Sequence, residues 1–132
     1  MPRTSVTSVD RSTGGSLKIA FVGGPGEEGR GLAYRFAKAG HECIIGSRSA
    51  EKAETAVAGL REKDAALPVR GATNADAVAA GELIIVTTPY TAQAGTLPPL
   101  ADAAAGKIVV STVVPMSFEG GKAALLAVPE GS

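Results

Sequence analysis

The sequence predicts an α/β fold built on a doubly wound parallel sheet of about five strands. Two observations lead to this prediction. Short apolar runs alternate with segments of helical periodicity, and a glycine-rich turn follows the first apolar run. Right-handed crossovers and a phosphate-type turn after the first strand favour the strand order 3-2-1-4-5.

The predicted strands are short apolar runs that stop at glycine or polar residues. In chain order they are residues 17–22, 43–45, a short edge strand at 69–70, then 83–86 and 108–110. The run at 83–86 is continuously apolar, which predicts a central strand covered on both faces. Sheets of this class usually contain about six strands. The sequence is therefore expected to be truncated before the last strand, and residues 115–121 are expected to form a loop.

Helical spacing recurs between these runs. The first helix follows the glycine turn and carries apolar residues at Leu32, Ala33, Phe36 and Ala37, with Gly40 as its stop signal. The second helix buries a face made of Ala53, Ala56, Val57 and Leu60. A third helix is expected to be capped by Asn74 and to run to Ala80. A fourth is expected to start near Thr91 and to break at the two prolines, residues 98–99.

Composition fits one globular domain at residues 17–132, since 45% of the 132 residues are hydrophobic. Residues 1–16 are rich in Ser, Thr and Gly and are expected to be a disordered leader. The 13 basic and 13 acidic residues balance, so nothing points to nucleic acid as a partner. The chain has a single cysteine and no apolar run of the roughly 20 residues that span a membrane. These features predict a cytoplasmic protein.

The turn after the first strand contains the pattern G-x-G-x-x-G at Gly24, Gly26 and Gly29. Gly24 is expected to permit the tight turn, and Gly26 to let a pyrophosphate approach the backbone. Gly29 is expected to let the helix pack closely on the sheet. The unpaired amides of the first helical turn would then face the phosphate oxygens. Because the pattern joins a strand to an amphipathic helix, it predicts a Rossmann-like dinucleotide site.

The end of the second strand predicts which dinucleotide binds. A site that prefers NAD carries Asp or Glu there, which repels a 2′-phosphate. This sequence instead has Ser47 and Arg48, with Lys52 four residues further on. A serine hydroxyl and a guanidinium can both donate hydrogen bonds to a phosphate. The sequence therefore predicts NADP(H).

Four segments taken together resemble the NADPH-dependent reductases of coenzyme F-420, a deazaflavin hydride carrier. They are residues 23–33, 45–48, 87–90 and 113–121, and the resemblance extends over residues 18–132. It implies hydride exchange between NADP(H) and the deazaflavin, with ring distance and stacking set by the protein. No catalytic acid–base pair and no metal site are expected.

The resemblance also implies roles for residues at matching positions. Contacts with the pyrophosphate would come from Pro25, Gly26, Glu27 and Glu28. Contacts with the 2′-phosphate would come from Ser47, Arg48 and Lys52. Tyr90 and Ala94 would border the adenosine side or a ribose, and Met116 would lie near the nicotinamide. Members of the family usually carry Thr at the position of Pro25, so one hydroxyl near the rings is missing.

The family continues past residue 132 into parts that supply much of the deazaflavin pocket and the contacts of a homodimer. Two other functions therefore stay open. One is an NADP-linked reductase of a different acceptor, such as an imine or a ferric chelate. The other is a non-catalytic NADP-binding module or fragment.

Overall fold

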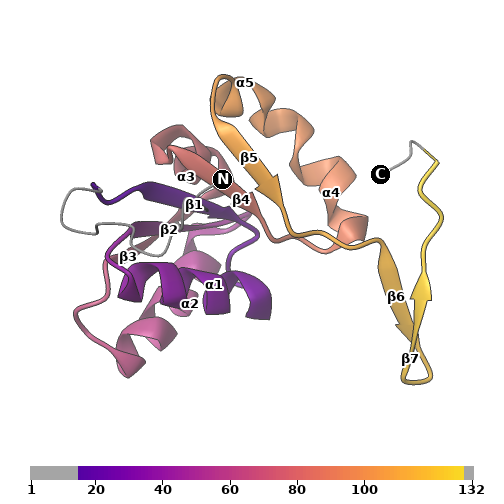
Figure 1. The fold of residues 1–132 in the computed structure, drawn as a ribbon, viewed down its shortest axis with the longest axis horizontal. Coiled ribbons are helices and arrows are strands. Elements are labelled where there is room, and N and C mark those ends of the chain that lie inside the picture. The colour runs from indigo at the N-terminus through magenta and orange to yellow at the C-terminus, as the bar shows by residue number, and fades with distance from the viewer. Residues whose placement is uncertain (1–14, 130–132) are drawn as a thin grey trace, which may run out of the picture.

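The computed structural model describes residues 15–129. Its main sheet is parallel throughout and has five strands in the order β3-β2-β1-β4-β5 (Figure 1). The strands are β1 (Lys18–Val22), β2 (Glu42–Ser47), β3 (Val69–Thr73), β4 (Leu83–Val86) and β5 (Ile108–Ser111). The predicted fold class and strand order are both confirmed.

The register aligns the carboxyl ends of the central strands. Val22 of β1 lies beside Gly46 of β2 on one side and Val86 of β4 on the other. Every strand of a parallel sheet runs in the same direction, so the loops that follow the strands gather at one edge.

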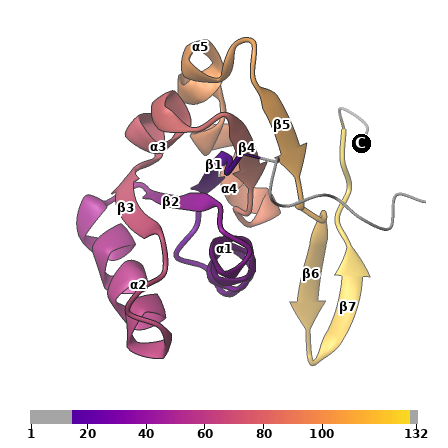
Figure 2. The same ribbon diagram turned by 60° about the vertical axis from the view of Figure 1, so that its left-hand side comes forward.

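Helices cover both faces of the sheet (Figure 2). On one face lie α1 (Glu27–Lys38) and α2 (Ala50–Lys63), and on the other α3 (Asn74–Ala80), the 3-10 helix η1 (Pro98–Leu100) and α5 (Ala101–Ala104). The helix α4 (Tyr90–Thr96) joins the end of β4 to η1. Side chains alternate along β1, so that Phe21 enters the core under α1 and α2 while Val22 enters the core under α3.

The helices form where the periodicity predicts them. Ala33 and Ala37 of α1 are buried, and Gly40 takes a φ of +98° just after the helix, a conformation that favours glycine. All four residues of the predicted apolar face of α2 are buried. Ser49 caps that helix by accepting a hydrogen bond from the Lys52 amide at 3.4 Å.

The expectation that Asn74 caps the third helix is wrong. Thr73 is the cap, because its hydroxyl accepts a hydrogen bond from the Asp76 amide at 3.2 Å. Asn74 is the first residue of α3, and its side chain turns instead toward the glycine turn of β1.

The expectation of a loop at residues 115–121 is also wrong. An antiparallel hairpin replaces it, made of β6 (Met116–Glu119) and β7 (Lys122–Leu125). Gly120 and Gly121 both have positive φ, +56° and +77°, which suits a two-residue hairpin turn. The hairpin stands apart from the main sheet (Figure 1).

The predicted leader falls largely outside the described residues, since residues 1–14 are not among them. Within residues 15–129, no helix has both the length and the apolar character needed to cross a membrane.

The edge strand β5 differs from the other strands of the main sheet because all of its residues are exposed. Ile108 is 68% exposed, Val109 49% and Val110 43%. β5 pairs only with β4, so its outer edge carries backbone N–H and C=O groups that no strand pairs. An apolar edge of this kind is a template for pairing with another chain.

We therefore expect the purified chain to self-associate through β5. Replacing Ile108 and Val110 together by lysine should shift it toward monomer, since two charges on one side of an edge strand oppose pairing. Size-exclusion chromatography with light scattering measures this shift.

The matched control adds the same two charges elsewhere, with Thr55→Lys and Ala58→Lys on the exposed side of α2. This control should associate like the original chain. A monodisperse monomer of the unmodified chain would contradict the expectation.

Candidate dinucleotide site

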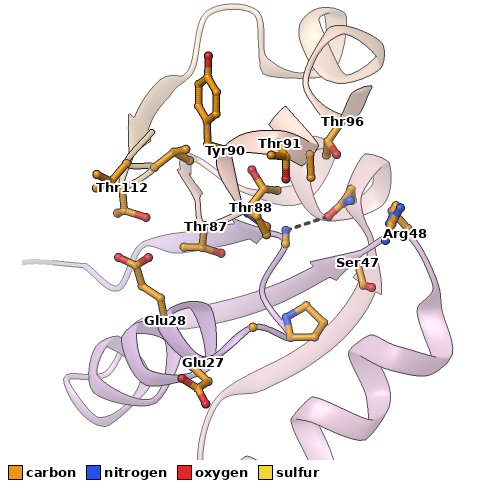
Figure 3. Close-up of a pocket in the computed structure, with 18 of the residues that line it drawn as sticks. Glu27, Glu28, Ser47, Arg48, Thr87, Thr88, Tyr90, Thr91, Thr96 and Thr112 are labelled. Carbon is orange, nitrogen blue, oxygen red and sulfur yellow. Dashed lines mark hydrogen bonds between the residues drawn. The ribbon is translucent and has the colours of Figure 1, made fainter. Parts of the chain in front are cut away.

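A cavity of about 810 Å³ opens at the carboxyl edge of the sheet, where β1 and β4 are neighbours. The chain leaves β1 toward α1 on one face and leaves β4 toward α4 and the other face, so the strand order reverses here. Open α/β sheets bind ligands at this reversal point. Figure 3 shows the side chains that surround the cavity.

Most of the residues predicted to contact a cofactor line this cavity. They are Pro25, Gly26, Glu27, Glu28, Ser47, Arg48, Lys52, Tyr90 and Met116. Gly24 and Gly29 are buried within the turn, and Ala94 is an exposed residue of α4 outside the cavity lining. The fold thus gathers residues from β2, α1, α2, α4 and the hairpin at one place, and their roles toward a cofactor stay predictions.

The glycine turn is packed so closely that Gly24 and Gly29 have no room for a side chain. Gly23 takes a φ of +75°, so it, rather than Gly24, makes the left-handed step of the turn. The Gly24 amide donates to the Gly46 carbonyl of β2 at 2.9 Å. A Cβ on Gly24 would lie 2.8 Å from Cγ2 of Ile45, and one on Gly29 would lie 2.6 Å from the Gly24 carbonyl oxygen. These contacts fix the start of α1 beside the strand ends.

The start of α1 offers backbone donors to the cavity. Gly26 is the N-cap, and no side chain of the described residues caps the first turn. A Cβ on Gly26 would find its nearest neighbour at 3.6 Å, so the missing side chain leaves space on the ligand side. Pro25 has no N–H, and the donors are therefore the amides of residues 27–29. Together with the helix dipole they form a site for an anion.

Glu27 and Glu28 occupy that first turn, and both are exposed. Figure 3 shows that their side chains point in different directions. Glu28 extends toward Thr87 and Thr112, whereas Glu27 points to the opposite side. Carboxylates stabilise a helix N-terminus when no anion is bound.

The end of β2 carries the polar and basic residues expected there. Ser47 is 6% exposed, and its hydroxyl oxygen accepts a hydrogen bond from the Ser49 amide at 3.3 Å. The hydroxyl proton is thus left to donate to an anion. Arg48 and Lys52 are exposed at the cavity wall and form no ion pair within the described part of the chain. This corner combines one hydroxyl donor with two cations.

Asn74 connects two parts of the site that are far apart in sequence. Its Oδ1 accepts a hydrogen bond from the Gly23 amide at 3.3 Å, the dashed line of Figure 3. The side chain is 8% exposed, lines the cavity and lies against Gly46. Asn74 therefore fixes the glycine turn from the side of β3.

Two threonines form the same hydrogen bonds with the last carbonyl groups of neighbouring strands. The amide and the hydroxyl of Thr87 both donate to the Val22 carbonyl, each at 2.9 Å. The amide and the hydroxyl of Thr112 donate to the Val86 carbonyl at 3.1 Å and 2.9 Å. Both hydroxyl protons are committed to the sheet, so these oxygens offer only lone pairs to the cavity.

Several lining residues were not singled out as ligands from the sequence, among them Asn74, Thr87, Thr88, Thr96, Thr112 and Phe118. A sequence signal exists for the threonines at 87, 88 and 112, because each lies within two residues of the end of a predicted strand. Asn74 and Phe118 carry no such signal, since their placement depends on the packing of α3 and on the hairpin.

The other chemically notable side chains lie outside the site. Cys43 is fully buried in β2, and burial together with Glu42 raises the pKa of its thiol to about 12. His41 accepts a hydrogen bond from the Leu17 amide at 3.1 Å through Nδ1. Both residues lie at the amino ends of β1 and β2, whereas the cavity lies at the carboxyl ends of the strands. Residues 15–129 contain no group of three or more side chains that could hold a metal ion.

Strand order, glycine turn and cavity define a Rossmann-like α/β domain of the class that binds dinucleotides. The sequence profile of the family described as "NADP oxidoreductase coenzyme F420-dependent" matches residues 18–115. The chain belongs to this family.

Curated relatives agree with this assignment. The chain is similar to an F420-dependent NADP reductase of Methanothermobacter marburgensis, with 48% identity over 111 residues, and to that of Methanocaldococcus jannaschii, with 39% over 122 residues. These matches cover 81% and 88% of this chain but 49% and 54% of the relatives. The chain therefore spans about half the length of the curated relatives it matches.

Solved structures give the same picture of the fold. A crystal structure from Arthrobacter sp., described as a candidate F420-dependent NADP reductase, matches with a TM-score of 0.73 and 29% identity, covering 89% of this chain and 54% of that one. A pyrroline-5-carboxylate reductase from Coxiella burnetii matches with a TM-score of 0.60 and 18% identity, covering 76% of this chain and 37% of that one. The second likeness concerns the fold alone.

The packing of the turn predicts a sharp difference between two glycines of α1. Gly29→Ala should destabilise the chain by about 2 kcal/mol, because its Cβ meets the Gly24 backbone, which cannot move aside cheaply. Denaturant unfolding measures the change.

Gly31→Ala is the matched control in the same helix. A Cβ there meets nothing within 4 Å, so the substitution should stabilise the chain by about 0.5–1 kcal/mol. Equal effects of the two substitutions would contradict the close contact between Gly24 and Gly29.

Proposed function

We propose that the cavity binds NADP(H) and that residues 17–132 form the NADP-binding domain of a reductase. This reductase would exchange hydride between NADP(H) and coenzyme F-420, since the curated relatives are F420-dependent NADP reductases. The observation that carries this proposal is the corner of Ser47 and Arg48 at the end of β2, beside the glycine turn. An acid at that position would disfavour the 2′-phosphate, and none is present.

The residues around the cavity fit the two anionic parts of the cofactor. The pyrophosphate would lie at the start of α1, where backbone amides face the cavity and Gly26 leaves room. The 2′-phosphate would accept a hydrogen bond from Ser47 and charge-assisted contacts from Arg48 and Lys52. Both anions are thus matched by donors that belong to separate elements of the fold.

The other end of the cavity suits the nicotinamide half. It is bordered by Thr112 and Met116, which follow β5, and by Tyr90 at the start of α4, which would lie against a ribose. A bound nicotinamide supplies the hydride chemistry itself, so the chain has only to orient the ring and exclude water.

The proposal extends to the longer protein. Residues that hold the deazaflavin are expected in the part of the relatives that has no counterpart here, together with the contacts of a homodimer. The partners proposed for the chain are small-molecule cofactors, and the location proposed is the cytoplasm. The balance of 13 basic and 13 acidic residues supports a protein without a nucleic-acid partner.

Arg48→Ala should weaken NADPH binding about tenfold or more. The substitution removes a charged hydrogen bond worth roughly 1.5–3 kcal/mol. The affinity for NADH, which has no 2′-phosphate, should hardly change. Fluorescence or calorimetric titration with both cofactors measures the two affinities.

The control is Arg35→Ala, which removes the same charge from the exposed last turn of α1, away from the cavity. It should leave both affinities nearly unchanged. Equal losses for NADPH and NADH in Arg48→Ala would show that Arg48 does not contact the 2′-phosphate.

Mixing the chain with NADPH and coenzyme F-420 tests the reaction. A fall in the deazaflavin absorbance with NADPH, and not with NADH, would show that this chain by itself holds both rings close enough for hydride transfer. NADPH binding without deazaflavin reduction would overturn the reaction for this chain and leave a nucleotide-binding module. Absence of NADPH binding would overturn the whole proposal.

A further inference from the structure

Thr88, the second residue after β4, has a buried hydroxyl that the fold does not use. The residue is 7% exposed and lines the cavity. Its Oγ1 is the single buried side-chain nitrogen or oxygen atom without a hydrogen-bond partner among residues 15–129. Buried polar atoms are nearly always paired, so an exception at a cavity wall calls for an explanation.

The neighbouring threonines show what a structural hydroxyl does at this edge. Thr87 and Thr112 each donate their hydroxyl proton to the last carbonyl of an adjacent strand. Thr88 follows Thr87 directly and makes no such bond. Its donor and its lone pairs are both available to a ligand.

The methyl group of Thr88 faces Gly23 in the turn after β1. Its methyl carbon Cγ2 lies so close to Gly23 that a Cβ on Gly23 would approach it to 2.7 Å. A threonine whose methyl group is fixed also has its hydroxyl fixed, because both are bonded to Cβ. In Figure 3 the side chain lies between Thr87 and Thr91 of α4, at the inner wall of the cavity.

An unpaired buried hydroxyl destabilises the protein without ligand, and valine has the same shape without that penalty. Stability of the fold therefore gives no reason for threonine at this position. A ligand that restores the missing hydrogen bond does.

The position of Thr88 indicates which part of the ligand it meets. Arg48 lies at the end of β2, on one side of β1, and Thr88 follows β4, on the other side. A dinucleotide with its 2′-phosphate at Arg48 and its pyrophosphate at α1 extends its second nucleoside over β4.

We propose that the Thr88 hydroxyl forms a hydrogen bond with the nicotinamide nucleoside of bound NADP(H), and so helps to position that half of the cofactor. The inference rests on the proposed function, because it needs NADP(H) in the cavity. It adds a positioning residue on the side of the site opposite the 2′-phosphate.

The test compares Thr88→Val with Thr87→Val in thermal unfolding and in titration. Without ligand, Thr88→Val should unfold at the same temperature as the original chain or higher, since it removes an unpaired group. Thr87→Val should unfold at a lower temperature, since it removes a hydrogen bond that the fold uses. The two variants lose the same atoms at adjacent positions.

Two ligands then separate the halves of the cofactor. Thr88→Val should bind NADPH about three- to tenfold more weakly, the range expected for one neutral hydrogen bond. Its affinity for adenosine 2′,5′-bisphosphate, which lacks the nicotinamide nucleoside, should not change. Thr88→Ser keeps the hydroxyl and loses the methyl group that faces Gly23, so it should bind NADPH more tightly than Thr88→Val and unfold at a lower temperature than the original chain.

The outcomes distinguish this inference from the proposed function. If the original chain binds neither ligand, the proposed function fails and this inference fails with it. If the original chain binds both and Thr88→Val binds NADPH equally well, only this inference fails. It fails too if Thr88→Val loses affinity for both ligands equally, or loses stability as Thr87→Val does.

Discussion

The contact between the backbones of Gly24 and Gly29 is the constraint on which the rest of the site depends. It places the first turn of α1 against the turn that leaves β1, closer than any side chain would allow. The Gly24 amide also bonds to β2 through Gly46, and Asn74 holds the Gly23 amide from the start of α3. The turn after β1 is thereby joined to the backbone of β2 and to a side chain of α3 at one point. This junction fixes the start of α1, whose unpaired amides face the cavity.

Hydroxyl groups at the carboxyl edge divide into two kinds. Thr87 and Thr112 donate their hydroxyl protons to the last carbonyl groups of β1 and β4. Their oxygens therefore offer only lone pairs to the cavity. Thr88 contributes nothing comparable to the sheet. This difference between adjacent threonines is consistent with a binding site, because a hydroxyl whose proton is already donated within the protein cannot donate it to a ligand. Binding groups of this kind lower stability when the ligand is absent.

The strands of the main sheet differ in how far they are buried. β1 and β2 are almost wholly buried, whereas every residue of β5 is exposed, as are Phe118 and Leu125 of the hairpin. The chain spans about half the length of its curated relatives. The well-packed part of the chain carries the corner proposed for the 2′-phosphate and the start of α1. The exposed part borders the end of the cavity proposed for the nicotinamide, where a hydride acceptor must also approach.

The sequence by itself determined the five strands of the main sheet, the helices between them, the strand order and the basic corner at Ser47 and Arg48. Those features depend on local periodicity, on glycine conformation and on chain direction, which are properties of short segments. Tertiary structure alone decided the partner of Asn74 and the unpaired hydroxyl of Thr88. The hairpin at residues 116–125 has a local signal in Gly120 and Gly121, which the expectation of a loop did not use. The bond from Asn74 to the glycine turn spans 51 residues, and no local pattern encodes a contact of that range. A threonine that supports a strand and one that is left for a ligand look identical in the sequence, because only the assembled sheet shows which carbonyl lies within reach.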